Sequence, residues 1–166
     1  MNDTYVECMV ARKSSPLKAV LKYAIYILAV ISGLSVLMGY IIFLVPLVIF
    51  GLLAYFVVPG FDLEYEYLYL DREISIDKIM SKQKRKRVRT LELNKMEKMC
   101  PINSHELDPY KSRNVKVSDY SSGIDGARVW VIVYTGKDGE ELVGIEPNEE
   151  MLKAVKSIYP RKVIEY

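Results

Sequence analysis

The sequence predicts an α+β protein: a transmembrane helical hairpin, then a small antiparallel β barrel or sandwich closed by a C-terminal amphipathic helix. Three observations predict this class. Residues 23–61 form a run of thirty-nine residues without a charged side chain. Short segments of alternating polar and apolar residues follow, separated by turn residues. An apolar stripe with helical spacing then follows Asn148 near the C-terminus.

The uncharged run is long enough for two membrane spans, because a bilayer core about 30 Å thick requires about 20 apolar residues of helix. We expect helices at about residues 16–38 and 40–58, so that the hairpin occupies residues 16–59. Pro16 suits a first helical turn. Pro46 falls inside the second predicted span, where it is expected to kink the helix.

Basic residues flank the hairpin, whereas its tip has none. Since positive charge marks the cytoplasmic side, we expect a multi-pass protein of the cell membrane with both termini in the cytoplasm. Residues 1–15 are then a short, only partly ordered cytoplasmic lead, and residues 61–166 form the cytoplasmic domain. A cleaved signal peptide is disfavoured, because a second apolar block follows the first at once.

The cytoplasmic domain is expected to consist of about seven strands and one closing helix. The predicted strands are residues 62–70, 73–79, 88–93, 96–102, 115–117, 128–135 and 140–146. The last two flank Gly136-Lys137-Asp138-Gly139 and form the strongest predicted hairpin. Residues 81–87 are expected to be a connecting turn, residues 103–114 an irregular connection, and residues 118–126 a mobile loop.

The closing helix is predicted after Asn148, which is a good N-cap, and before Pro160, which lies just past its end. Glu149 and Glu150 favour the positive end of the helix dipole. Its apolar stripe consists of Met151, Leu152, Val155, Ile158 and Tyr159.

The order of strands first and one amphipathic helix last resembles the pleckstrin-homology (PH) fold. Residues 67–79 resemble the opening hairpin of bacterial membrane proteins that carry such a domain. The chain also resembles a family of small, uncharacterised bacterial two-span membrane proteins, through residues 1–8, 84–87 and 148–154. The resemblance implies a PH-like cytoplasmic domain on the inner membrane, and it implies no particular activity.

The sequence departs from PH domains that bind inositol phosphates in one respect. Those domains hold the ligand with Lys and Arg around the loop between the first two strands. Here that loop is Asp71-Arg72-Glu73, which is short and acidic. Recognition of phosphoinositides in that manner is therefore not expected.

A polybasic run is the sharpest candidate site. Its six cations are Lys82, Lys84, Arg85, Lys86, Arg87 and Arg89. A first strand of about nine residues leaves the membrane by about 30 Å, at about 3.3 Å per residue, and the second strand returns. The run could then face the anionic inner leaflet and bind lipid or a partner. The alternative is a solvated turn whose charges only orient the chain during insertion.

The rest of the sequence offers little for catalysis. His105 is the only histidine, so a histidine-rich metal site is excluded and a Ser/His/Asp triad would have to use this residue. Cys8 and Cys100 match no metal-binding spacing, and we expect no metal and no cofactor. Nucleic-acid binding is disfavoured, because residues from 61 onward carry nineteen Lys and Arg against nineteen Asp and Glu.

The sequence therefore favours a membrane-anchored, non-catalytic binding or scaffolding module. One alternative is an accessory subunit of a larger membrane assembly, or a homo-oligomer, that packs through the small residues Gly33, Ser35, Gly39 and Gly51 of the spans. The other is an enzyme with an unrecognised site near His105.

Overall fold

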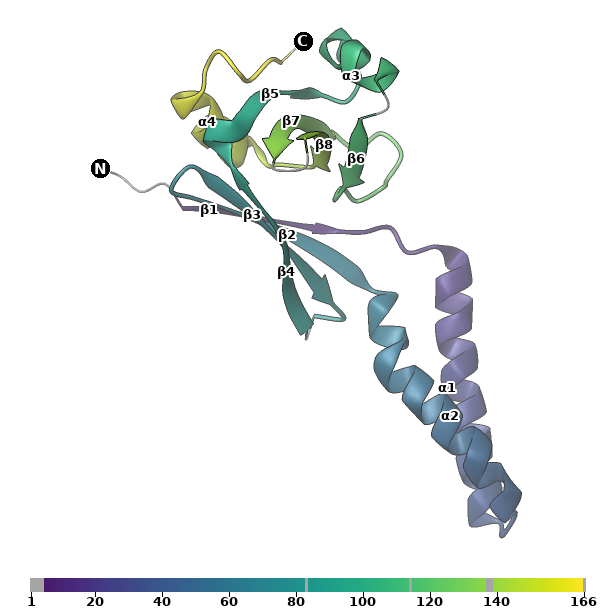
Figure 1. Ribbon diagram of the computed structural model, residues 1–166. Helices are drawn as coiled ribbons and strands as arrows, with labels where there is room; N and C mark the ends of the chain where they lie inside the picture. Colours follow the sequence, from purple (N-terminus) through teal and green to yellow (C-terminus); the bar gives the residue numbers. More distant parts are fainter. Residues whose placement is uncertain (1–4, 83, 114, 137–138, 166) are drawn as a thin grey trace. The chain divides into compact units, whose positions relative to one another are not determined.

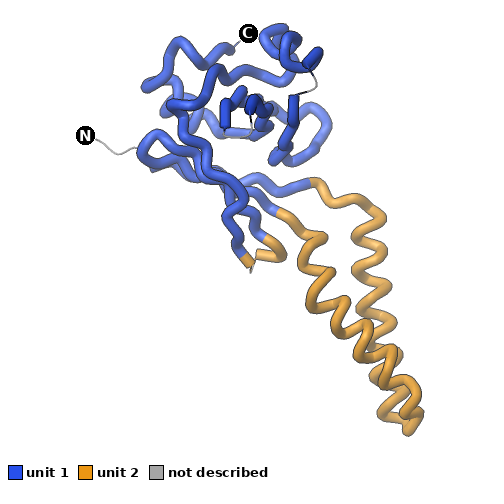
Figure 2. Tube along the Cα trace, in the orientation of Figure 1, with its two compact units in different colours: residues 1–12, 64–79, 85–166 blue, residues 13–63, 80–84 orange. Residues whose placement is uncertain are grey.

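The computed structural model describes residues 5–82, 84–113, 115–136 and 139–165 (Figure 1). The chain divides into two compact units (Figure 2). Unit 1 comprises residues 1–12, 64–79 and 85–166, and unit 2 comprises residues 13–63 and 80–84.

Unit 2 contains the predicted helical hairpin. Helix α1 spans Pro16–Leu37, and the 3-10 turn η1 (Ile41–Phe43) leads into helix α2 (Leu44–Phe56), which the short turn η2 (Val58–Gly60) ends. Two helical segments, Pro16–Leu37 and Ile41–Gly60, are long and apolar enough to cross a membrane. In the most apolar stretch of each segment, only 11% and 6% of the residues, respectively, are buried in the protein. Such extensive exposed apolar surface requires a membrane or another protein to cover it.

Pro46 lies where a proline is tolerated. Because α2 begins at Leu44, Pro46 is in its first turn, whose N–H groups have no partner within the helix. The predicted kink inside a long second span is thus replaced by a fresh helix start after η1. Gly39, with a φ of +94°, reverses the chain at the hairpin tip.

The first sheet has the strand order β1-β2-β3-β4. Its strands are β1 (Val6–Ala11), β2 (Leu63–Leu70), β3 (Glu73–Met80) and β4 (Lys84–Glu92). Strand β1 is antiparallel to β2, from Val6 opposite Tyr69 to Ala11 opposite Glu64. The prediction of an only partly ordered lead is wrong for Val6–Ala11, which belong to the folded domain. Residues 1–4 lie outside the described residues.

The tight turn predicted at Asp71-Arg72 is confirmed. Both residues have positive φ values, 50° and 65°, as a two-residue hairpin turn requires. Ser81 and Lys82 make the same kind of turn between β3 and β4, with φ values of 46° and 56°. Strand β4 therefore begins at Lys84, and most of the basic run is strand, where a turn through residue 87 was predicted.

The second sheet has the strand order β5-β7-β8-β6. Its strands are β5 (Met96–Pro101), β6 (Lys116–Asp119), β7 (Trp130–Gly136) and β8 (Gly139–Ile145). The predicted β7–β8 hairpin is confirmed, with Gly136 opposite Gly139, while Lys137 and Asp138 lie outside the described residues. Strand β6 runs parallel to β8, so this sheet is not purely antiparallel. The two sheets are separate, and the barrel alternative is not observed.

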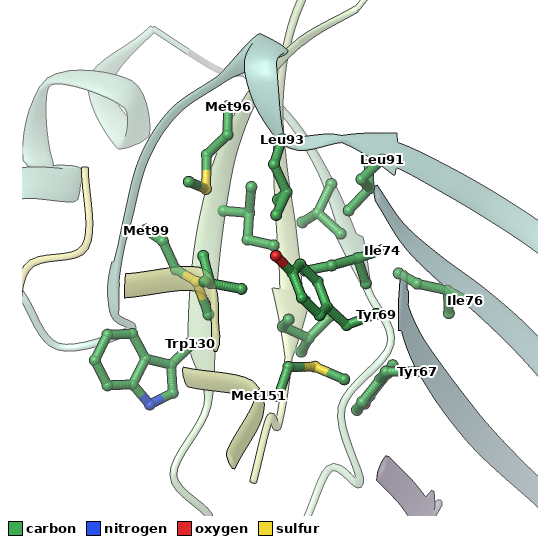
Figure 3. Close-up of a cluster of buried hydrophobic side chains, with 14 of the residues drawn as sticks. Tyr67, Tyr69, Ile74, Ile76, Leu91, Leu93, Met96, Met99, Trp130 and Met151 are labelled. Carbon is green, nitrogen blue, oxygen red and sulfur yellow. The ribbon is translucent and has the colours of Figure 1, made fainter. Parts of the chain in front are cut away.

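The main core of unit 1 draws on both sheets (Figure 3). Ile132 of β7 belongs to the same buried cluster as four residues that come earlier in unit 1, and all five are fully buried. The four are Tyr67, Ile74, Ile76 and Leu93. Strand β7 is buried on both faces, as predicted: Ile132 joins this core, while Val131 and Val133 join a second cluster with Leu107 and Tyr110. Those last two residues belong to η4 (His105–Leu107) and α3 (Asp108–Ser112).

Helix α4 spans Glu149–Ile158. Its predicted cap is confirmed, because Asn148 Oδ1 accepts a hydrogen bond of 2.8 Å from the Met151 amide. Met151 and Val155 are fully buried in the main core, whereas Ile158 is 40% exposed. The predicted stripe thus packs on the core through Met151 and Val155, with Leu152 and Tyr159 partly buried against it.

Candidate functional site

The arginines of the basic run pair with buried acids of the first sheet. Arg85 Nε donates to Asp77 Oδ2 at 2.7 Å, and Arg87 Nε donates to Asp77 Oδ1 at 3.0 Å. The Arg85 guanidinium also contacts Glu66. Both acids are only 3% exposed. Because a buried carboxylate needs a counter-charge, these arginines have a structural task.

The two acids respond to burial in opposite ways. Burial alone would raise the pKa of Asp77. The hydrogen bonds from Arg87 and Arg85 lower it by more than burial raises it, so the pKa of Asp77 lies below its ordinary value. Burial also raises the pKa of Glu66, and a shared hydrogen bond with Glu7 raises it again. Glu66 Oε2 makes no well-aligned hydrogen bond within the described residues, even though Arg85 touches it. Glu66 therefore keeps its proton to a higher pH than an exposed glutamate.

We expect Glu66→Gln to change the pH dependence of stability. Between the ordinary and the raised pKa of Glu66, the folded chain holds more protons than the unfolded chain, so the free energy of unfolding falls as pH rises. Asp77 has the opposite sign, since its contribution is lost as pH falls through its lowered pKa. The Gln variant should lose the Glu66 decline and keep the Asp77 loss at acid pH.

The measurement is unfolding of the full chain in detergent from about pH 4 to pH 8. Trp130 is the single tryptophan and is 9% exposed, so its fluorescence reports on the core of unit 1. Glu149→Gln is the matched control, because that side chain is 81% exposed on α4. Identical pH profiles for Glu66→Gln and the original chain would contradict the assignment.

Arg89, the last cation of the run, pairs with a different buried acid. Its guanidinium contacts Glu141 of β8, a side chain that is 8% exposed. Ser118 Oγ donates to the same carboxylate at 2.5 Å, and Lys116 Nζ lies 3.8 Å from it. Arg89 therefore links β4 to the second sheet.

The lysines of the run are placed differently. No ion pair joins Lys82, Lys84 or Lys86 to an acid within the residues that the structure describes. Lys84 Nζ lies 4.9 Å from the centre of the Tyr55 ring of α2, a cation–π contact. The sequence carries a signal for this division, because the three arginines occupy odd positions, 85 to 89, and the three lysines even positions, 82 to 86.

The β3–β4 turn packs against the end of α2 within unit 2. The Ser81 amide donates to the Asp62 carbonyl at 2.9 Å, and Ser81 Oγ donates to the Pro59 carbonyl at 3.3 Å. Pro59 and Asp62 follow α2 directly in the chain. The start of the basic run is thus held at the end of the second candidate span.

The remaining candidate residues do not gather into a site. His105 is fully exposed on η4, with Asp108 Oδ2 at 3.3 Å from its Nδ1. Cys100 is buried in the second cluster. Cys8 Sγ donates to the carbonyl of Glu146, a residue far away in the sequence. No group of three or more His, Cys, Asp or Glu that could hold a metal occurs in the described part of the chain.

The loop predicted to be mobile is well packed in its first part. Ser121 and Ser122 are 4% and 2% exposed. The Ser122 amide and Oγ both donate to Glu146 Oε1, at 2.7 and 2.6 Å. Residues 121 and 122 are therefore fixed on Glu146, whereas residues 123–126 are exposed.

The chain thus combines two candidate membrane-spanning helices with two sheets and a terminal helix, an arrangement that agrees with a PH-like domain. The family model described as bacterial PH-like domain (DUF6106) matches residues 2–165, and the chain belongs to this family. A comparison with curated proteins gave no match, and a comparison with solved structures gave none either.

Proposed function

We propose that this protein is a membrane-anchored, non-catalytic binding or scaffolding module whose β3–β4 lysines dock on the anionic inner leaflet. One observation carries the proposal: the β3–β4 turn is hydrogen-bonded to the chain just after α2. If α2 crosses the bilayer, its end lies at head-group depth. Lys82 and Lys84 then lie next to the lipid phosphates.

The division of the run between arginines and lysines refines this proposal. The arginines neutralise Glu66, Asp77 and Glu141, so the lysines supply the charge for docking. Each lysine near an anionic leaflet contributes about 1 kcal/mol, and the attraction decays within about a Debye length. Three lysines therefore contribute about 3 kcal/mol at low salt.

The orientation of the chain follows the same charge logic. Arg12, Lys13, Lys18 and Lys22 precede or begin α1, and the residues after α2 carry many more cations. Both termini then lie in the cytoplasm, and the tip around Gly39 lies outside.

The docking proposal is tested by limited trypsin cleavage of the full chain in vesicles. We expect cleavage after Lys82 to be several-fold slower in vesicles with phosphatidylglycerol than in pure phosphatidylcholine, because lysines at the anionic surface are shielded. The difference should disappear at high salt. Cleavage after Arg113, which is 65% exposed, is the internal control and should not depend on the lipid.

Charge reversal sharpens the test. Lys82→Glu removes its own cleavage site, so Lys86→Glu is the useful variant, and it should reduce the lipid-dependent protection at Lys82. Equal rates after Lys82 in both lipids at low salt, relative to Arg113, would exclude docking through this turn.

A second candidate is an accessory subunit of a larger membrane assembly. Helices α1 and α2 are close at Gly33, where an added Cβ would lie 3.7 Å from Leu47 Cδ1. Gly51 has open space around it and could admit a partner helix. Cross-linking through the spans in native membranes separates this role from lipid docking alone.

A further inference from the structure

Unit 2 contains a cavity that is lined mostly by residues outside the basic run. Its volume is about 250 Å³, and it lies between the start of α1, the end of α2 and the β3–β4 turn. The lining residues that matter here are Lys22, Tyr26, Tyr55, Ser81 and Lys84. The volume is below the range of about 300–1,000 Å³ typical of sites for drug-sized molecules. It therefore suits a small polar group.

The cavity carries an excess of positive charge. Lys22 Nζ donates to Asp62 Oδ2 at 2.6 Å, so this lysine is paired with one carboxylate. Lys84 is held over the Tyr55 ring and pairs with no acid in the described chain. Two ammonium groups thus face one cavity with a single carboxylate beside them, which favours an anion. Ser81, Tyr26 and Tyr55 add hydroxyl groups.

The position of the cavity indicates the source of the anion. Lys22 is in the second turn of α1, and Tyr55 is next to the last residue of α2, so both belong to the same end of the hairpin. Tyrosines and snorkelling lysines at the ends of spans mark the bilayer interface. Ala54, Val58 and Met80 supply an apolar wall next to the charged groups. This combination matches a group whose phosphate is joined to apolar chains.

We propose that this cavity binds the phosphate of one anionic phospholipid of the inner leaflet, held by Lys84 and Lys22. The inference rests on the proposed membrane anchoring, and it adds a stoichiometric site to the diffuse attraction of the polybasic run. Basic pockets between helices on the cytoplasmic side are a known physical solution for holding lipid head groups.

The test is native mass spectrometry of the full chain released from mild detergent, with phosphatidylglycerol or phosphatidylcholine added at equal concentrations. We expect one phosphatidylglycerol to remain bound per chain, and phosphatidylcholine to be retained much less. Lys84→Met should weaken retention of phosphatidylglycerol by about tenfold or more, because a charge-assisted hydrogen bond is lost. Lys84→Arg should restore it.

Lys86→Met is the matched control, since this exposed lysine is next but one in β4 and does not line the cavity. It should leave retention of the bound lipid unchanged while weakening the trypsin protection described above. Failure of docking and failure of the cavity site are thereby distinguished. Equal retention of both lipids, an unchanged affinity in Lys84→Met, or saturation of the site by inorganic phosphate alone would overturn the proposal.

Discussion

Replacing Arg89 with methionine is expected to lower the free energy of unfolding by about 3 kcal/mol, because it leaves the buried Glu141 carboxylate without its guanidinium partner. Glu141 would retain Ser118 as a hydrogen-bond donor and Lys116 at 3.8 Å. Since the Arg89 side chain is 30% exposed, water can reach the vacated position and keeps the loss at the lower end of the range for buried pairs.

The change is measured by denaturant unfolding of the full chain in detergent, followed through Trp130. Lys86→Met is the control on the same strand, and it should change the free energy of unfolding by less than about 0.5 kcal/mol. Arg89→Met combined with Glu141→Met should recover much of the loss, because the unpaired charge is then gone. If Arg89→Met behaved like Lys86→Met, the Arg89–Glu141 pair would have no role in stability.

Deleting residues 1–11 is expected to destabilise unit 1 by about 4 kcal/mol or more, or to prevent its folding, because strand β1 is removed. The deletion takes away the buried Val6 and uncovers the edge of β2, which carries the core residues Tyr65, Tyr67 and Tyr69. Trp130 should then show a red-shifted emission and a lower unfolding midpoint.

A milder variant keeps this prediction testable if the truncated chain does not fold. Val6→Ala should cost about 1.5 kcal/mol, since about two buried methyl-sized groups are lost. Tyr5→Ala is the control, because Tyr5 is 57% exposed and its hydroxyl donates to the carboxylate of the nearby Glu7. An unfolding midpoint unaffected by deletion of residues 1–11 would show that β1 is dispensable.

The elements that sequence reasoning predicted well are those set by local physics. The β7–β8 hairpin is specified by Gly136 and Gly139 between two β-forming runs. Helix α4 is specified by Asn148 and the spacing of Met151 and Val155. Neither prediction needed knowledge of residues far away in the chain.

The largest errors concern partners that are distant in sequence. Val6–Ala11 alternate in burial as a strand should, but their partner β2 follows only after two long apolar helices, so the sequence did not indicate the pairing. The candidate site was affected in the same way. Six neighbouring cations were treated as equivalent, although the arginines and lysines alternate in the sequence. The positions of Asp77, Glu66 and Glu141 in the structure show that the arginines are the ones that pair with buried acids. Arginine's planar fork suits such buried pairs better than an ammonium group does.

The sequence by itself determined that this chain has two apolar helices followed by strands and one capped helix, because segment length, periodicity and turn residues act within about twenty residues. Only the tertiary structure decided that β1 joins the domain, that β6 runs parallel to β8, and that the three arginines neutralise buried acids. It also decided that Lys22 and Lys84 line one cavity. These features depend on contacts between residues far apart in the chain, and such contacts form only when the whole core is assembled.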